Sequence, residues 1–126
     1  MDKELIVKVA GGLGNQMFMY ANALYLAKKY NYKLSIDNTS GFFQSKNRTY
    51  KRNYSLDMFN LSANLAKKRD KYDNYLSHNN KKIMKFLNKF QKKKSFLSDP
   101  TYINKNTFYN KLDVLLSNKV YLEGYF

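Results

Sequence analysis

A run of glycines directly behind a short apolar segment constrains this chain more than any other feature. Residues 5–10 are rich in β-branched side chains, which is typical of a strand buried in a parallel sheet. A glycine turn (residues 11–16) follows, and then apolar residues at helical spacing. A strand, a tight turn and a helix N-terminus bring backbone N–H groups and the positive end of the helix dipole to one point, which suits a phosphate or another anion. The candidate binding residues are Gly11, Gly12, Gly14, Asn15 and Gln16.

The segment after the turn predicts one βαβ unit. We expect a helix from Asn15, as its N-cap, to about residue 30, with Asn31 ending it. Residues 33–37 alternate in character and predict the next strand, so the sheet is expected to be parallel. The residues expected to face the core from this helix are Met17, Tyr20, Ala21, Leu24 and Ala27, with Phe18 and Tyr25 beside them.

The remainder of the chain predicts further elements of the same lobe. A long polar loop over residues 38–53 is expected at the carboxyl edge of the sheet, where α/β folds bind ligands. A short strand or turn over 54–61 and helices near 63–71 and 107–117 are expected next, and a strand over 119–126. We therefore expect a single α/β lobe over residues 1–126, with a parallel sheet flanked by helices.

A second helix is predicted over residues 79–94. It carries Ile83, Phe86, Leu87 and Phe90 at i, i+3, i+4 and i+7, with a basic outer face. Two interpretations remain open: a helix that packs on the core with its lysines extending to solvent, or a helix that docks on a membrane or an acidic partner.

Composition excludes several classes of site. The chain has no Cys and a single His, His78, which excludes a thiolate metal site and a His-based zinc site. The sequence contains no D-x-D pair that would clamp a divalent cation on a diphosphate. The net charge of +14 indicates either an anionic partner, including peripheral membrane contact through Lys, or a solvated lysine surface. No signal peptide or transmembrane segment is visible, so we expect a cytoplasmic protein.

Three other interpretations of the glycine turn fit the sequence less well. Gly12-Leu13-Gly14 supplies the first two glycines of a dinucleotide-binding G-x-G-x-x-G motif, but Met17 occupies the third glycine position, although Asp37 lies where a ribose-binding acid would be. A P-loop is excluded because no Gly-Lys-Ser/Thr follows. A purely structural turn would leave the two amides of Asn15 and Gln16 unexplained, since such amides can donate to phosphate or sugar oxygens.

The same segment resembles a known family signature. Gly11-Gly12-Leu13-Gly14-Asn15-Gln16-Met17-Phe18, followed by Tyr20-Ala21, is similar to the N-terminal signature of the α-1,2-fucosyltransferases of glycosyltransferase family 11. Tyr54-Ser55-Leu56-Asp57-Met58-Phe59-Asn60 resembles the family's L-x-x-F-N segment, and Tyr121-Leu122-Glu123-Gly124-Tyr125-Phe126 resembles its Y-L-x-G-Y-F/W strand. The three segments occur in the family's order, with a departure at Met19, where the family often has Gln.

The resemblance implies a GT-B-type enzyme of two Rossmann-like lobes. It implies metal-independent, inverting transfer of L-fucose from GDP-fucose to a galactose 2-hydroxyl of a surface glycan, with no cofactor. The partners are then a sugar-nucleotide donor and a galactose-containing acceptor, and no specific nucleic acid. The family's H-x-R-x-G-D-Y segment is absent from the chain, so we expect an N-terminal fragment, inactive alone, that lacks the nucleotide-binding lobe.

Within that interpretation the glycine turn faces the donor diphosphate, with Asn15 as its leading side chain. The general base is left unassigned, because Asp37, Asp57 and Glu123 are each better explained as cap, turn or surface residues. The rings of Phe42, Phe43 and Tyr50 either face an acceptor sugar or fold over the core. The alternatives are an inactive remnant and a non-enzymatic basic domain that binds anionic partners.

Overall fold

The structure is a computed structural model that describes residues 3–42, 51–91, 95–98 and 118–124. The expected helix over 107–117, together with Phe43 and Tyr50, lies outside the described residues. Of the described helices, none is both long enough and apolar enough to cross a membrane.

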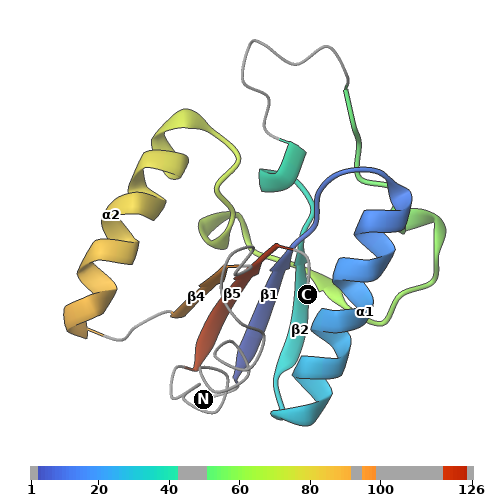
Figure 1. Ribbon diagram of the computed structural model, residues 1–126, viewed down its shortest axis with the longest axis horizontal. Helices are drawn as coiled ribbons and strands as arrows, with labels where there is room; N and C mark the ends of the chain where they lie inside the picture. Colours follow the sequence, from blue (N-terminus) through green and yellow to red (C-terminus); the bar gives the residue numbers. More distant parts are fainter. Residues whose placement is uncertain (1–2, 43–50, 92–94, 99–117, 125–126) are drawn as a thin grey trace.

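Five parallel strands form one sheet with the order β3-β2-β1-β5-β4 (Figure 1). The central strand β1 pairs along its whole length with β2, and Glu4 lies opposite both Lys33 and Lys119. Because every strand runs in the same direction, all the carboxyl ends meet at one edge of the sheet. The strands are β1 Glu4–Lys8, β2 Lys33–Asp37, β3 Asn64–Leu65, β4 Ser95–Ser98 and β5 Lys119–Glu123.

Helices α1 (Leu13–Lys29) and α2 (Tyr75–Gln91) lie on opposite faces of this sheet. The larger core lies between α1 and the sheet and includes Leu5, Val7, Ala23, Leu26, Leu34, Ile36, Val120 and Leu122. The intervening strand residues Ile6 and Tyr121 point to the other face, where they pack with Ala66 and Tyr72. This arrangement confirms the predicted α/β fold, and it is consistent with a Rossmann-like lobe.

The boundaries of α1 differ from the prediction at its N-terminus. The helix begins at Leu13 with Gly12 as its N-cap, in extended backbone and without a side-chain cap bond. Asn15 is therefore a first-turn residue and not the N-cap. The predicted end is confirmed, because Asn31 follows the C-cap Tyr30 with a left-handed φ of 58°.

The buried face of α1 matches the predicted one only in part: Ala27 is buried and Tyr20 and Leu24 pack against the core, whereas Ala21 is exposed. The residues that it buries are Gln16, Met19, Ala23, Leu26 and Ala27. Met17, Phe18 and Tyr25 are 47%, 54% and 58% exposed. The prediction failed in part because it treated Gln16 as a surface residue, whereas its side chain is fully buried and sets the rotation of the helix.

The segment between β2 and α2 contains turns in place of the expected helix near 63–71. Two 3-10 turns, Leu56–Met58 and Lys68–Asp70, flank the short strand β3. Ala66 donates its N–H to Ile36 O at 2.8 Å, so pairing with β2 takes up backbone groups that a helix would have used internally. The predicted helix is wrong, while the turn expected within 54–61 is present.

Helix α2 starts four residues earlier than predicted and turns its apolar side outwards. Its start is fixed by a reciprocal pair of bonds, in which Ser77 N–H donates to Asn74 Oδ1 at 2.7 Å and Asn74 N–H donates to Ser77 Oγ at 3.1 Å. Ile83 and Phe86 are 56% and 64% exposed, so the core-packing interpretation is wrong for them. The side chains of Leu87 and Phe90 lie outside the described set.

Candidate functional site

The glycine turn joins β1 to α1 at the carboxyl edge of the sheet. Gly11 has a left-handed φ of 76°, which favours glycine, and Gly12 ends the turn in extended backbone. Gln16 N–H donates to Gly12 O at 3.0 Å, which is the first helical bond of α1. The first turn carries no acidic residue, so nothing on it opposes the attraction of its N–H groups and dipole for an anion.

Asn15 lies directly against the glycine turn. A Cβ on Gly11 would lie 2.9 Å from Asn15 Nδ2 and 3.3 Å from Asn15 Cβ, so the absence of a side chain at Gly11 lets this amide fold back over the turn. Asn15 is exposed. Gly14 is exposed as well, and its Cβ position has nothing within 4 Å among the described residues. The structure thus brings Gly11, Gly12, Gly14 and Asn15 together at one accessible point.

Gln16 has a different role from the substrate-binding role that its sequence position suggested. Its side chain is fully buried. Nε2 donates to Gly11 O and to Asn53 O, both at 2.9 Å, and Oε1 accepts from Ser55 N–H at 2.9 Å. Because these bonds use both amide hydrogens and the oxygen, Gln16 positions the 53–55 segment against the glycine turn and does not face a ligand.

Arg52 is a site residue that sequence reasoning missed. Its Nη1 lies 3.0 Å from the position that a Cβ on Gly12 would occupy, so the guanidinium rests close against the turn. Arg52 is exposed and directly precedes the segment that Gln16 holds. The sequence signal that could have indicated Arg52 is the rarity of arginine. The chain has three arginines, Arg48, Arg52 and Arg69, among many lysines.

Asp37 ends β2 on the same edge, and its carboxylate is saturated by protein donors. Oδ1 accepts from Thr39 N–H at 3.1 Å and Ser40 N–H at 3.0 Å. Oδ2 accepts from the Ser40 hydroxyl and from Tyr121 O–H at 2.6 Å. Asp37 is therefore a turn residue, as expected, but a buried one that links β2 to β5. These contacts leave it poorly suited to hold a ribose.

Glu123, at the end of β5, forms an ion pair with Lys81 of α2. The Lys81 amine also lies 5.6 Å from the ring centroid of Tyr72 and 5.5 Å from that of Tyr121. Burial lowers the pKa of Lys81, and the hydrogen bond that Lys81 donates to Glu123 opposes that shift. This pair fastens α2 to the sheet, which gives Glu123 a structural role. Asp57 lies exposed in the first turn of η2 (Leu56–Met58), a turn position of the expected kind.

His78 lies on α2 one turn before Lys81 and is half-buried. Its pKa is lowered by burial first and then by the charges of Lys81, Lys82 and Lys8, while Glu123 opposes the shift. Burial and the nearby lysine charges therefore favour the neutral imidazole. Phe42 is half-buried against the larger core, which supports the core-covering interpretation for that ring.

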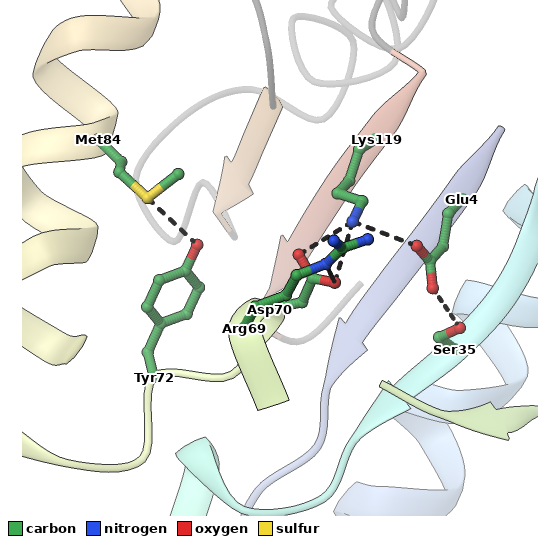
Figure 2. A network of polar contacts seen from close by, with 7 residues as sticks. All are labelled: Glu4, Ser35, Arg69, Asp70, Tyr72, Met84 and Lys119. Atoms are coloured by element: carbon green, nitrogen blue, oxygen red, sulfur yellow. Dashed lines mark hydrogen bonds and ion pairs between the residues drawn. The ribbon is translucent and has the colours of Figure 1, made fainter. Parts of the chain in front are cut away.

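A separate polar cluster is centred on Lys119 and Glu4, at the opposite, amino-terminal ends of β5 and β1 (Figure 2). Lys119 Nζ lies 2.9 Å from Asp70 Oδ2 and 3.5 Å from Glu4 Oε2, and Ser35 donates to Glu4 Oε1 at 2.7 Å. Arg69 lies at 3.8 Å from Asp70, with a side chain that is 71% exposed. These contacts anchor the 68–70 turn across the strands, far along the sheet from the glycine turn. Across the described ranges, no group of three or more His, Asp or Glu side chains is arranged to hold a metal ion.

A comparison with known proteins adds one relationship. Over 53 residues, the chain is 40% identical to the O-antigen biosynthesis glycosyltransferase WbnK of Escherichia coli, a match that covers 42% of this chain and 18% of that protein. The similarity is to a glycosyltransferase. The chain thus spans less than a fifth of the length of this relative. No protein-family model and no solved structure matches the chain.

Proposed function

We propose that this chain forms the N-terminal lobe of a galactoside α-1,2-fucosyltransferase of glycosyltransferase family 11. It would act with a second lobe that carries the nucleotide site, and it would transfer L-fucose from GDP-fucose to a galactose 2-hydroxyl with inversion. The similarity to a glycosyltransferase and the three ordered segments that resemble family 11 support this proposal. The observation that carries it is the guanidinium of Arg52 resting over Gly12 at the open N-terminus of α1.

The proposed chemistry requires stabilisation of a departing diphosphate. Negative charge develops on the leaving GDP as the bond to fucose breaks, and fixed donors that point at that charge lower the barrier. In the proposed metal-independent reaction, the N–H groups at the start of α1, the Asn15 amide and the Arg52 guanidinium are donors at the turn that would stabilise this charge. Gln16 acts one step further away, because it holds the backbone next to Arg52 in place.

The test compares two exposed arginines in the complete enzyme. Arg52→Gln and Asn15→Ala should each lower kcat by about a hundredfold, the loss typical of removing one preorganised donor. Arg69→Gln is the matched control, because Arg69 is exposed and lies at the other end of the sheet. Transfer of radiolabelled fucose from GDP-fucose to a galactoside measures activity, and circular dichroism checks that each variant is folded.

Two results would contradict the proposal in different ways. Wild-type turnover in both Arg52→Gln and Asn15→Ala would remove the glycine turn from the donor site. Transfer from another sugar nucleotide, with none from GDP-fucose, would leave a glycosyltransferase but overturn the fucosyl assignment.

A further inference from the structure

Helix α2 directs an apolar stripe away from the sheet. Leu76, Ile83 and Phe86 are 75%, 56% and 64% exposed. At 100° per residue these three positions fall on one side of the helix, and Lys81 falls on the opposite side. Lys81 is only 6% exposed and is paired with Glu123 of β5. The side of α2 that carries Lys81 is thus the anchored side, and Figure 1 shows the helix alongside the β5–β4 half of the sheet.

This orientation is the reverse of the usual one. A helix on the surface of a globular lobe normally turns its apolar stripe to the core and its charges to water. Large exposed apolar side chains grouped on one helix face are typical of an interaction surface. We name this group of Leu76, Ile83 and Phe86 the outer stripe of α2.

The charge of α2 indicates the chemistry of the partner. The helix sequence contains four lysines, Lys81, Lys82, Lys85 and Lys89, and no Asp or Glu. The chain as a whole carries a net charge of +14. A helix that combines an exposed apolar stripe with exclusively basic charges has the character of helices that lie flat in the interface of an anionic membrane.

We propose that the outer stripe of α2 docks this lobe onto an anionic lipid surface. Leu76, Ile83 and Phe86 enter the boundary between headgroups and acyl chains, and the exposed Lys82 contacts lipid phosphates. The helix lies on the membrane, in line with the finding that no described helix could span one. This proposal does not depend on the fucosyltransferase assignment.

The test uses the 126-residue chain and sedimentation with lipid vesicles. The chain should bind vesicles of phosphatidylcholine mixed with phosphatidylglycerol and should not bind phosphatidylcholine alone, and added salt should weaken binding. Phe86→Ser should lower the partition coefficient about tenfold, because about 1.4 kcal/mol of apolar burial is lost. Ile83→Ser should have a similar effect. Phe18→Ser is the matched control: Phe18 is a 54% exposed phenylalanine on α1, and its loss should leave binding unchanged.

Circular dichroism establishes that each variant is folded before it is compared. Equal binding of wild type, Phe86→Ser and Ile83→Ser would overturn the proposal, because lysine charge alone would then account for the attraction. The absence of binding to anionic vesicles would also overturn it. A concentration-dependent dimer that Phe86→Ser dissociates, seen by analytical ultracentrifugation, would assign the stripe to a second copy of the chain instead.

Discussion

At the scale of single residues, Gly41 shows how closely the backbone packs beside the candidate site. Gly41 lies in the 3-10 turn η1 (Ser40–Phe42) that follows β2. A Cβ on this residue would overlap the carbonyl oxygen of Val9 and would lie 2.8 Å from the Cβ of Ala10. The turn after β2 thus packs backbone to backbone on the two residues that lead into the glycine turn.

Gly41→Ala should therefore destabilise the protein by about 1–3 kcal/mol, because the overlap falls on backbone that cannot rotate away. Gly14→Ala is the control, since its Cβ position is open and alanine favours a helix over glycine by about 1 kcal/mol. Urea unfolding of both variants measures the difference. Equal urea midpoints for Gly41→Ala and the wild type would contradict this prediction, because the loop after β2 would then accommodate the added methyl group without loss of stability.

Two adjacent residues of the glycine turn, Asn15 and Gln16, have different roles that the sequence does not reveal. Asn15 and Gln16 have similar side chains, and both were expected to bind a ligand. The helix period places Asn15 outwards and Gln16 inwards, where three bonds occupy its amide. Gln16 holds Asn53 and Ser55 against the turn, and Arg52 next to them lies close to Gly12. No local sequence pattern predicts such a contact.

At the scale of secondary structure elements, a hydroxyl–carboxylate network ties β2, β5 and the loops on one face together. Tyr121 donates to Asp37 across β1, and Tyr72 N–H donates to Ser40 Oγ. The rings of Tyr72 and Tyr121 meet edge to face, with centroids 5.1 Å apart. Burial is the main reason that the pKa of both phenols is raised, and nearby carboxylates add to the shift. The pKa of Tyr72 is raised to about 12.

These phenols predict an alkaline limit to stability. Between pH 10 and pH 12 the folded state keeps the Tyr72 proton, whereas an unfolded chain loses it near the ordinary pKa of 10. The stabilising contribution is therefore complete below pH 10 and is lost as the pH rises towards 12. Urea unfolding from pH 8 upwards should show a falling free energy of unfolding, with a shallower fall in Tyr72→Phe. Parallel curves for wild type and variant would refute this role.

Sequence patterns predicted the elements better than their faces. Local signals predict the strand at 33–37, the glycine turn and the end of α1 at Asn31. These signals are alternating polarity, closely spaced glycines, and a residue type that tolerates left-handed backbone. The exposed stripe of α2 and part of the buried face of α1 do not follow from such signals, because a buried Gln16 and a buried Lys81 reverse the usual link between polarity and exposure. The two-residue strand β3 is equally invisible, since β2 and not local propensity supports it.

At the scale of the whole molecule, positive charge is in large excess. Lys and Arg number 23 against nine acidic residues. Several acidic groups are already committed to ion pairs with basic partners, including Asp70, Glu4 and Glu123. The remaining positive charge repels itself across the folded surface, which opposes compaction at low ionic strength.

The free energy of unfolding should therefore rise as sodium chloride is added, because at 0.1 M salt largely screens the repulsion between exposed charges more than about 10 Å apart. Lys67→Glu should make this dependence shallower, since the exposed Lys67 lies in a basic run with Lys68 and Arg69. Thermal unfolding across a salt series measures both effects. A stability that falls with added salt would show that attractive ion pairs, and not net repulsion, dominate.

The order of the sheet has a consequence for how the chain is made. Of the described strands, β1 is synthesised first, and β2 follows it after a short stretch of sequence. The other edge of β1 pairs with β5. On that edge Glu4 therefore has no strand partner until Lys119 has been synthesised. Long-range pairings of this kind close slowly, and an open strand edge invites pairing with another molecule. The nascent βαβ unit therefore has one unpaired edge of β1 until β5 has been synthesised.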